Sequence, residues 1–214
     1  MGWWLKNITM SVLHYFSNNP NKRAKFIFNF IAPIYKIADK ALVKNYQKTI
    51  DILDNELSIK NKTVLDIGTG TGAWATTYKI KNAKNITGVD FADKMLNISK
   101  QKHPEIHFEK ADAENLINFK DNSFDIVTAS YVLHGVKQER RKTILKEMQR
   151  VSAQYIVLHD FVGKTPIFIR FLEFMEKSDY KFFKQNICNE LNSIFSSTKK
   201  IKVDKGSGLY ICYK

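Results

Sequence analysis

The amino-acid sequence predicts a doubly wound α/β fold around a mostly parallel seven-stranded sheet with a reversed last strand, preceded by N-terminal helices. Two observations lead to this prediction. From Thr63 onward, short apolar runs alternate with amphipathic segments of helical period, which is typical of parallel strands covered by helices on both faces. The chain then closes with two strand-like runs around a Gly-rich turn, and such a hairpin reverses one strand.

Size and composition fit a single domain over residues 1–214. Of the 214 residues, 44% are hydrophobic and 26% are charged, so one core can form. We divide the domain into an N-terminal helical cap (1–60), an α/β core that holds the ligand (61–160), a helical lid insertion (161–198) and a terminal hairpin (199–214). Cys188 and Cys212 match neither a disulfide framework nor a metal-ligand spacing, so no metal site is expected.

The first sixty residues are predicted to be helical. Apolar residues recur on one helix face between Trp4 and Phe16, until the segment ending at Pro20 breaks the pattern. A second stripe of helical spacing, which includes Tyr46, runs from Leu42 to Leu57. Pro33 is expected to mark a kink or a boundary between helices.

The remaining elements are predicted from the alternation of strand-length apolar runs with segments of helical period. Strands are expected over 63–67, 85–89, 106–109, 124–130 and 155–159, and helices over 73–81, 92–102 and 138–151. An aromatic-rich helical region over 166–195 precedes the hairpin, whose strands we place at 200–204 and 209–213 around Gly206-Ser207-Gly208.

A Gly-rich turn joins the first predicted strand to a helix in the segment Val64 to Ala73 (VLDIGTGTGA). Glycines at such a turn let backbone N–H groups approach a ligand closely. Gly68, Gly70 and Ala73 also satisfy the dinucleotide fingerprint, so the turn alone leaves an NAD(P) oxidoreductase open. Asp66 shifts the balance, because a carboxylate at the strand end suits a ligand with an ammonium group better than a pyrophosphate.

Two further acids end the next two strands. Asp90 follows the second strand, where a carboxylate can accept both hydrogen bonds of a ribose diol, and Asp112 follows the third, where it can accept one from an adenine amino group. Parallel strands bring Asp66, Asp90 and Asp112 to the same edge of the sheet. Three acids there describe a site for a cationic nucleoside rather than for a phosphate-bearing cofactor.

At these residues the sequence resembles the S-adenosylmethionine-dependent methyltransferases of the Rossmann-like class, and within them the ubiquinone/menaquinone biosynthesis methyltransferase-like group. The resemblance is strongest between Phe30 and Asp160, in five blocks that occur in order. They are Ile31–Tyr35 (IAPIY), Val64–Gly72 (VLDIGTGTG), Gly88–Leu96 (GVDFADKML), Ala111–Leu116 (ADAENL), and Asp121–Val127 (DNSFDIV) leading into Val132–His134.

The resemblance implies a Rossmann-like methyltransferase fold, S-adenosylmethionine as cofactor and S-adenosylhomocysteine as product. It implies that Asp66, Gly68 and Gly70 hold the methionine end, that Thr69 lines the turn, and that Asp90 holds the ribose. By the same resemblance, the remaining cofactor contacts are Phe91 and Met95 around the adenine, Asp112 and the backbone of Ala113 at its edge, Ser130 through its carbonyl, and Tyr35 from the N-terminal segment.

Two departures bear on the substrate. Many relatives carry a Lys-Pro-Gly-Gly turn where this chain has Arg150 to Gln154 (RVSAQ), which puts the subgroup in doubt but not the cofactor. Methyltransferases that act on amino groups of adenine or glutamine carry an Asn/Asp-Pro-Pro-aromatic motif after the fourth strand. Ala129 to Val132 (ASYV) stands there instead, which argues against those substrates.

Methyl transfer from a sulfonium requires mainly position and a dry site, although a carbon or hydroxyl acceptor must also lose a proton. His134 and His159 are the candidate general bases, because both follow apolar strands. The alternative for either is a neutral, packed histidine. Asp160 is expected to cap a helix rather than to orient a neighbour. His103 lies away from the strand ends and is expected to be structural.

The expected substrate is a small or lipophilic molecule, walled by the N-terminal helices and by aromatic residues of the insertion over 161–183. The net charge of +13 admits an anionic partner, or reflects composition alone. A basic surface keeps an RNA methyltransferase open, and Trp3 and Trp4 keep peripheral membrane contact open. A third alternative is a cofactor-binding module without turnover. The absence of a transmembrane run or a leader pattern leads us to expect the cytoplasm.

Overall fold

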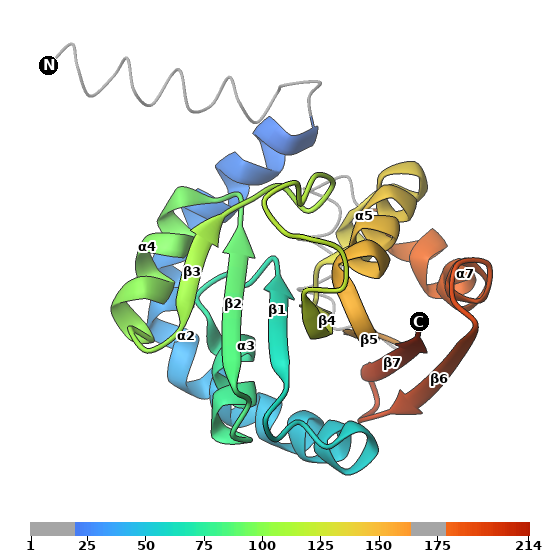
Figure 1. Ribbon diagram of the computed structural model, residues 1–214. Helices are drawn as coiled ribbons and strands as arrows, with labels where there is room; N and C mark the ends of the chain where they lie inside the picture. The colour runs from blue at the N-terminus through green and yellow to red at the C-terminus, as the bar shows by residue number, and fades with distance from the viewer. Residues whose placement is uncertain (1–19, 164–178) are drawn as a thin grey trace, which may run out of the picture.

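Seven strands form one sheet in the computed structural model, which describes residues 20–163 and 179–214 (Figure 1). The strands are β1 (Thr63–Ile67), β2 (Asn85–Asp90), β3 (His107–Lys110), β4 (Phe124–Ser130), β5 (Ser152–Phe161), β6 (Ser197–Lys202) and β7 (Ser207–Tyr213). Their order across the sheet is β3-β2-β1-β4-β5-β7-β6. Every described pair is parallel except those of β7 with β5 and β6. The mostly parallel sheet with a reversed last strand is therefore confirmed.

Helices cover both faces of this sheet, as the doubly wound prediction requires. They are α2 (Pro20–Leu57), α3 (Ala73–Ile80), α4 (Asp93–Lys102), α5 (Gln138–Val151) and α7 (Tyr180–Asn192), with a short 3-10 helix η1 (Leu133–Gly135). Alternate residues of β1 point to opposite faces. Leu65 and Ile67 pack in the core cluster formed with α5 and α7, whereas Val64 packs in the cluster formed with α2 and α3. All three side chains are fully buried.

Most element boundaries agree with the sequence prediction within two residues, and β5 and the hairpin differ more. β5 begins earlier than predicted, at Ser152, because pairing with β4 continues before the apolar run, where Ser152 pairs with Phe124. On its other side, β5 pairs with β7 from Tyr155, which lies opposite Tyr213. In the hairpin, Gly208 belongs to β7 and the turn lies earlier, where Asp204 accepts the backbone N–H groups of Gly206 and Ser207, both at 2.7 Å.

The expected boundary at Pro33 is wrong, because α2 is one helix of 38 residues with Pro33 inside it. Packing on both sides of the proline holds the helix together. Ala32 is fully buried against Ala92 and Met95 of the α4 region, and Leu53 is fully buried in the cluster with α3. Tertiary contacts of this kind stabilise a helix more than local propensity does.

Several predictions concern residues outside those that the structure describes. The predicted helix that includes Trp4 falls in residues 1–19, and three aromatic residues of the predicted lid, Phe168, Phe171 and Phe174, fall in 164–178. Within residues 20–163 and 179–214, no helix combines the length and the apolar character that crossing a bilayer requires.

Candidate functional site

The residues predicted to hold the ligand meet at the carboxyl ends of the parallel strands. In the sheet register, Asp66 of β1 lies beside Gly88 of β2 and Thr128 of β4. Ser130 at the end of β4 lies beside His159 of β5. Figure 1 shows β1, β2 and β3 running in the same direction, so that their last residues share one edge. The topology thus brings the two halves of the predicted site together.

The Gly-rich turn fits closely against the segment after β4 and leaves space at its centre. Gly68 has φ 66°, and a Cβ there would lie 2.6 Å from Cγ2 of Val132. Gly70 has φ 56°, and a Cβ there would meet no atom within 4 Å. Both residues occupy the left-handed region that favours glycine. The first glycine therefore allows close packing, and the second borders open space at the strand ends.

The carboxylate of Asp66 is buried at the end of β1. The residue is 1% exposed, and neither carboxylate oxygen has a hydrogen-bond partner among the described residues. Burial raises the pKa of Asp66 to about 7, and the charge of Asp90 adds to the rise. The Thr69 side chain and the Ala75 backbone oppose it without reaching hydrogen-bonding geometry. A buried carboxylate in this condition is stabilised by a cationic ligand.

Asp90 holds the turn in place. Its Oδ2 accepts the N–H of Gly70 at 2.9 Å and its Oδ1 accepts the N–H of Ala92 at 2.8 Å. Burial raises the pKa of this carboxyl in spite of these bonds. Each carboxylate oxygen has two lone pairs, so the group retains acceptor capacity for a diol. Asp90 therefore shapes the glycine turn and can still bind a ribose.

The other predicted cofactor residues differ from one another in burial. Phe91 is half-buried, with its ring 6.3 Å from that of Phe28 in an edge arrangement. Met95 is 2% exposed and packs against Ala32 of α2, so its contact with an adenine stays a prediction. Asp112 is exposed, unlike the other two acids, and accepts the N–H of Glu114 at 3.0 Å.

Three further predicted cofactor residues lie on the glycine turn, on α2 and after β3. The Thr69 hydroxyl is buried without a hydrogen-bond partner among the described residues. Tyr35 is 37% exposed on α2, and Ala113 packs partly against the core cluster of α5 and α7. The cofactor roles of all three stay predictions.

His159 is a neutral histidine inside a box of aromatic rings. Its ring centroid lies 5.6 Å from Tyr46, 5.2 Å from Trp74 and 4.7 Å from Tyr131. Nδ1 is 3.1 Å from the Ser130 hydroxyl, and Nε2 has no partner among the described residues. Burial lowers the pKa of His159 to about 4. Such an imidazole is a poor acceptor for a proton near neutral pH.

His134 has a carboxylate partner instead. Its Nδ1 lies 2.8 Å from Oδ1 of Asp160, and its backbone N–H donates to Oδ2 at 3.3 Å. Asp160 is 1% exposed. Asp160 therefore accepts a backbone N–H of the short helix that carries His134, as a capping residue does, and it also orients the His134 ring across 26 residues of sequence, which was not expected. When Nδ1–H is donated to a carboxylate, Nε2 is the nitrogen that carries the lone pair.

Sequence reasoning missed two groups of residues at this edge. Tyr46 and Trp74 form part of the box around His159. The helical spacing of Tyr46 predicted only core packing, and Trp74 was not singled out. Tyr131 has φ 53°, a left-handed conformation that is uncommon for an aromatic residue and typical of functional turns. No local pattern marks such a residue in advance.

The second group fixes the short helix that carries His134. The buried Arg141 guanidinium donates to the carbonyl oxygens of Leu133, at 3.4 Å, and of Val136, on either side of His134. Its Nε also donates to Oε2 of Glu190 on α7 at 2.7 Å. This ion pair holds η1 between α5 and α7.

A buried carboxylate on α2 supports the glycine turn from the other side. Oδ1 of Asp39 accepts the Thr71 hydroxyl at 2.8 Å, and Oδ2 lies 3.2 Å from Nε2 of His103. These bonds with His103 and Thr71 lower the pKa of Asp39, although burial opposes them. The structural role expected for His103 is confirmed by this contact, and α2 is tied to the turn that carries Gly70.

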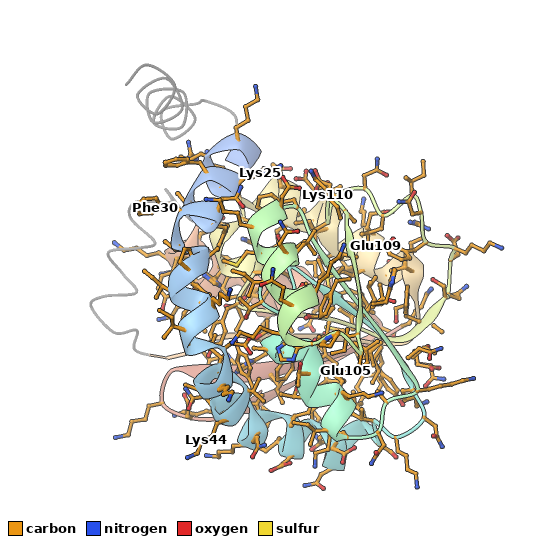
Figure 2. All side chains as sticks on the ribbon, turned by 90° about the vertical axis from the view of Figure 1, so that its left-hand side faces the viewer. Lys25, Phe30, Lys44, Glu105, Glu109 and Lys110 are labelled. Carbon is orange, nitrogen blue, oxygen red and sulfur yellow. The ribbon has the colours of Figure 1, made fainter. Side chains whose placement is uncertain are left out.

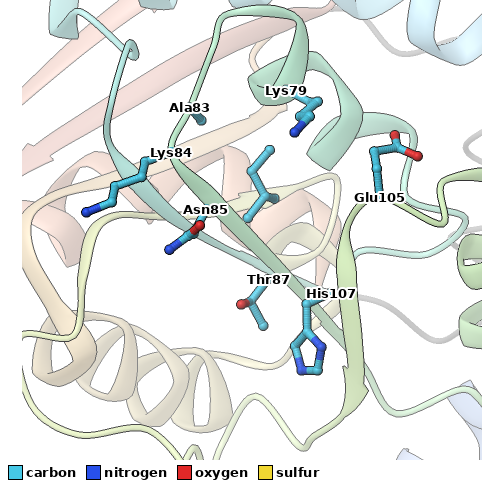
Figure 3. A pocket seen from close by; sticks show the side chains of 8 residues that line it. Lys79, Ala83, Lys84, Asn85, Thr87, Glu105 and His107 are labelled. Atoms are coloured by element: carbon cyan, nitrogen blue, oxygen red, sulfur yellow. The ribbon is translucent and has the colours of Figure 1, made fainter.

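A separate hollow of about 370 Å³ lies at the opposite edge of the sheet, at the amino ends of β2 and β3 (Figure 3). Lys79, Lys84, Glu105 and His107 line it. These four side chains are polar, and none belongs to the predicted site. The hollow is therefore not the ligand site.

Comparison with known proteins matches the part of the chain that contains the candidate site. A family model described as a methyltransferase domain matches residues 64–154. Over 198 residues the chain is 30% identical to the ubiquinone/menaquinone biosynthesis C-methyltransferase UbiE of Campylobacter jejuni, covering 83% of this chain and 78% of that protein. It is 33% identical to the demethylmenaquinone methyltransferase of Paenarthrobacter aurescens over 131 residues, 59% of this chain. That alignment spans about half, 49%, of the relative's length.

Solved structures share the fold. A candidate S-adenosyl-L-methionine-dependent methyltransferase of Methanococcus maripaludis matches with a TM-score of 0.67 at 20% identity, covering 86% of this chain and 92% of that one. Magnesium protoporphyrin IX methyltransferase of Synechocystis with bound SAM matches with a TM-score of 0.58 at 17% identity, covering 79% of each chain. Together with the motifs and the sheet order, these matches show that the chain belongs to the Rossmann-like S-adenosylmethionine-dependent methyltransferases, among the relatives of the ubiquinone/menaquinone biosynthesis group.

Proposed function

We propose that the protein transfers a methyl group from S-adenosylmethionine to a small lipophilic acceptor with a hydroquinone-type ring. The observation that carries the proposal is Asp66, a buried carboxylate at the end of β1 that has no partner among the described residues. It stands next to a glycine turn that borders open space at Gly70. A zwitterionic nucleoside with an ammonium group and a ribose satisfies both features.

The residues present fit this cofactor. Asp66 would accept hydrogen bonds from the ammonium group, and the backbone around Gly68 and Gly70 would line the methionine end. Asp90 would receive the ribose hydroxyls through the lone pairs that its two backbone bonds leave available. When bound, the cofactor supplies an electrophilic methyl group on a sulfonium with its own leaving group.

The acceptor side of the site is apolar and aromatic. Around His134, the ring centroids of Phe161, Tyr180 and Phe183 lie at 4.8, 6.2 and 6.4 Å. Tyr131 joins this group with its ring 4.7 Å from that of Phe161. Walls of this kind bind flat apolar rings and keep water away.

We assign the general base to His134 rather than to His159. The acceptor hydroxyl would give its proton to Nε2 of His134, and the Asp160 carboxylate would stabilise the imidazolium that forms. Loss of this proton would raise the electron density of the acceptor ring. The ring carbon would form its bond to the methyl group as the sulfur–methyl bond breaks, with that electron pair remaining on sulfur. The ring carbon would then lose its proton to water, and the His134 imidazolium would return its proton to the ring oxygen. His159, with its pKa lowered to about 4, would act as a wall of the site.

The acceptor class is supported by the names of the relatives. Demethylmenaquinone methyltransferase and ubiquinone/menaquinone biosynthesis C-methyltransferase act on quinone-type rings, as those names state. The chain lacks the Asn/Asp-Pro-Pro-aromatic motif of amino-methyltransferases, which favours a carbon or oxygen acceptor. The cytoplasmic location stays a prediction.

The cofactor is tested by calorimetric titration with S-adenosylhomocysteine and NADH. We expect binding of the first and none of the second. Asp66→Asn should weaken S-adenosylhomocysteine binding about 100-fold, because a buried charge-assisted bond is lost. Asp121→Asn is the matched control, since the Asp121 side chain is 68% exposed and pairs with Arg150. Equal affinity in wild type and Asp66→Asn would contradict the proposed site.

The reaction is tested with radiolabelled methyl groups. Purified protein is incubated with [methyl-³H]S-adenosylmethionine and either a short-chain demethylmenaquinol or total RNA, and the organic and RNA fractions are counted. Label in the quinol fraction supports the proposal. Label in RNA alone would favour the RNA methyltransferase, and cofactor binding without any transfer would favour a binding module.

A further inference from the structure

The outer face of α2 carries large apolar side chains that point into water. Phe30, Ile34 and Ile37 are 73%, 65% and 87% exposed. Their spacing of four and three residues places them on one helix face, and we call these three residues the α2 stripe. Figure 2 shows Phe30 pointing away from the body of the protein. Contiguous exposed side chains of this size mark interaction surfaces.

The opposite face of the same helix is packed. Ala32, Ile50 and Leu53 are buried at 0%, 1% and 0% exposure, and Asp39 is buried at 2%. The helix thus has one apolar face that forms the core and a second one that does not. The stripe therefore contributes little to the described core and is available to a partner outside the fold.

Basic side chains continue the α2 stripe along the helix. Lys40, Lys44 and Lys48 follow at four-residue spacing and are all exposed. In the part of the chain that the structure describes, no ion pair involves any of these three lysines. Between residues 20 and 50 the sequence contains seven Lys or Arg residues and one acid, the buried Asp39. The outer face is therefore both apolar and cationic, with Phe30 and Lys44 on the same side in Figure 2.

We propose that the α2 stripe docks the protein on an anionic lipid bilayer. Phe30, Ile34 and Ile37 would enter the boundary between headgroups and acyl chains, while the three lysines would contact lipid phosphates. A bilayer matches both properties of this face. A second copy of the chain would bring like charges together, and a nucleic acid would leave the apolar side chains without a role.

The stripe also lies beside the candidate site. The same part of α2 contacts the segment that follows β2: Lys25 pairs with Asp93 at 2.6 Å, and the Asn29 side chain accepts the N–H of Lys94 at 3.0 Å. Docking through the stripe would therefore hold the carboxyl edge of the sheet close to the lipid. The docking proposal itself does not depend on methyl transfer.

The test is co-sedimentation of the full chain with vesicles of phosphatidylcholine alone or mixed with phosphatidylglycerol. We expect binding to the mixed vesicles, weakened by salt. The triple variant Phe30→Ser, Ile34→Ser and Ile37→Ser should lower the partition coefficient at least about tenfold. The triple variant Lys40→Gln, Lys44→Gln and Lys48→Gln should lower it by a similar factor.

Matched controls change equivalent residues elsewhere. Ile117→Ser removes an apolar side chain that is 79% exposed between β3 and β4. Lys79→Gln, Lys84→Gln and Lys120→Gln remove three exposed lysines outside α2. Both controls should bind mixed vesicles like the wild type. Thermal unfolding and S-adenosylhomocysteine titration of every variant separate a folding defect, or a failure of the proposed function, from a loss of docking.

Three results would overturn the proposal. The first is absence of binding to the mixed vesicles. The second is loss of binding in the lysine variant while the stripe variant binds normally, which would indicate a general polyanion surface. The third is a dimer in light scattering that the stripe variant dissociates while vesicle binding stays unchanged, which would assign the stripe to a second copy of the chain.

Discussion

The two halves of the candidate site differ in how their polar groups are satisfied. On the β1–β2 side, the Asp66 carboxylate is buried with both oxygens unpartnered among the described residues. On the β4–β5 side, His134 has its carboxylate, Asp160, and His159 has the Ser130 hydroxyl, and aromatic rings enclose both. In the first half a buried acid is unpaired within the described part of the chain, whereas in the second half the acid is paired with a histidine among aromatic rings. This contrast agrees with the proposed function, in which one half binds a cationic cofactor and the other an apolar acceptor.

The largest expected effect separates the two histidines. His134→Asn keeps a donor toward Asp160 but removes Nε2, so transfer to a quinol should fall about 10²-fold or more while S-adenosylhomocysteine affinity is unchanged. His159→Gln should reduce transfer by less than tenfold, about 1 kcal/mol of barrier. Single-turnover rates with labelled cofactor measure both. A larger loss in His159→Gln would reverse our assignment of the base.

The glycine turn offers the next test. Gly70→Ala adds a methyl group in open space and should weaken cofactor binding about tenfold, with a loss of stability of about 1 kcal/mol from the positive φ. Gly68→Ala meets Val132 as well and should cost more stability. Calorimetric titration and thermal unfolding provide the two measurements. A greater loss of stability in Gly70→Ala than in Gly68→Ala would contradict the geometry.

The unpartnered acid also predicts a pH dependence. Because burial raises the pKa of Asp66 to about 7, the carboxylate is only partly ionised in the free protein near neutral pH. Affinity for S-adenosylhomocysteine should therefore fall about tenfold between about pH 8 and pH 6. Asp66→Asn should remove this dependence. A flat pH profile in the wild type would show that the ligand ammonium does not pair with Asp66.

The smallest effect concerns the stability of the ligand-free protein. Asp66→Asn is expected to raise this stability although it weakens ligand binding. A carboxyl whose pKa is raised by folding contributes most stability below its unfolded pKa, near 4, and loses that contribution as pH rises toward 7. Relative to the wild type, Asp66→Asn should therefore gain a few degrees in Tm between about pH 5 and pH 8. Thermal unfolding without ligand measures this. A constant difference across this range would contradict the buried, unpaired state of Asp66.

Much of the charged half could be predicted from the sequence, because its signals are local. The alternation of apolar runs predicted the strands of the sheet, and each acid lies at or just after the carboxyl end of a strand. The partners in the apolar half could not be predicted in this way. Asp160 meets His134 only because β5 pairs with β4, and Tyr46 reaches His159 only because α2 packs across α3. Contacts of this kind depend on tertiary packing, which the spacing of residues along the chain does not predict.

The buried carboxylate of Asp39 has a consequence for the whole molecule. Asp39 lies two residues after Ile37 of the α2 stripe and accepts the hydroxyl of Thr71, the residue next to Gly70. The packed face of α2, opposite the stripe, is thus joined to the cofactor turn through one side chain. If lipid binding to α2 changes the affinity of the turn for the cofactor, then by thermodynamic reciprocity a bound cofactor changes the affinity for lipid by the same factor. In that case α2 couples the lipid-binding surface to the cofactor site.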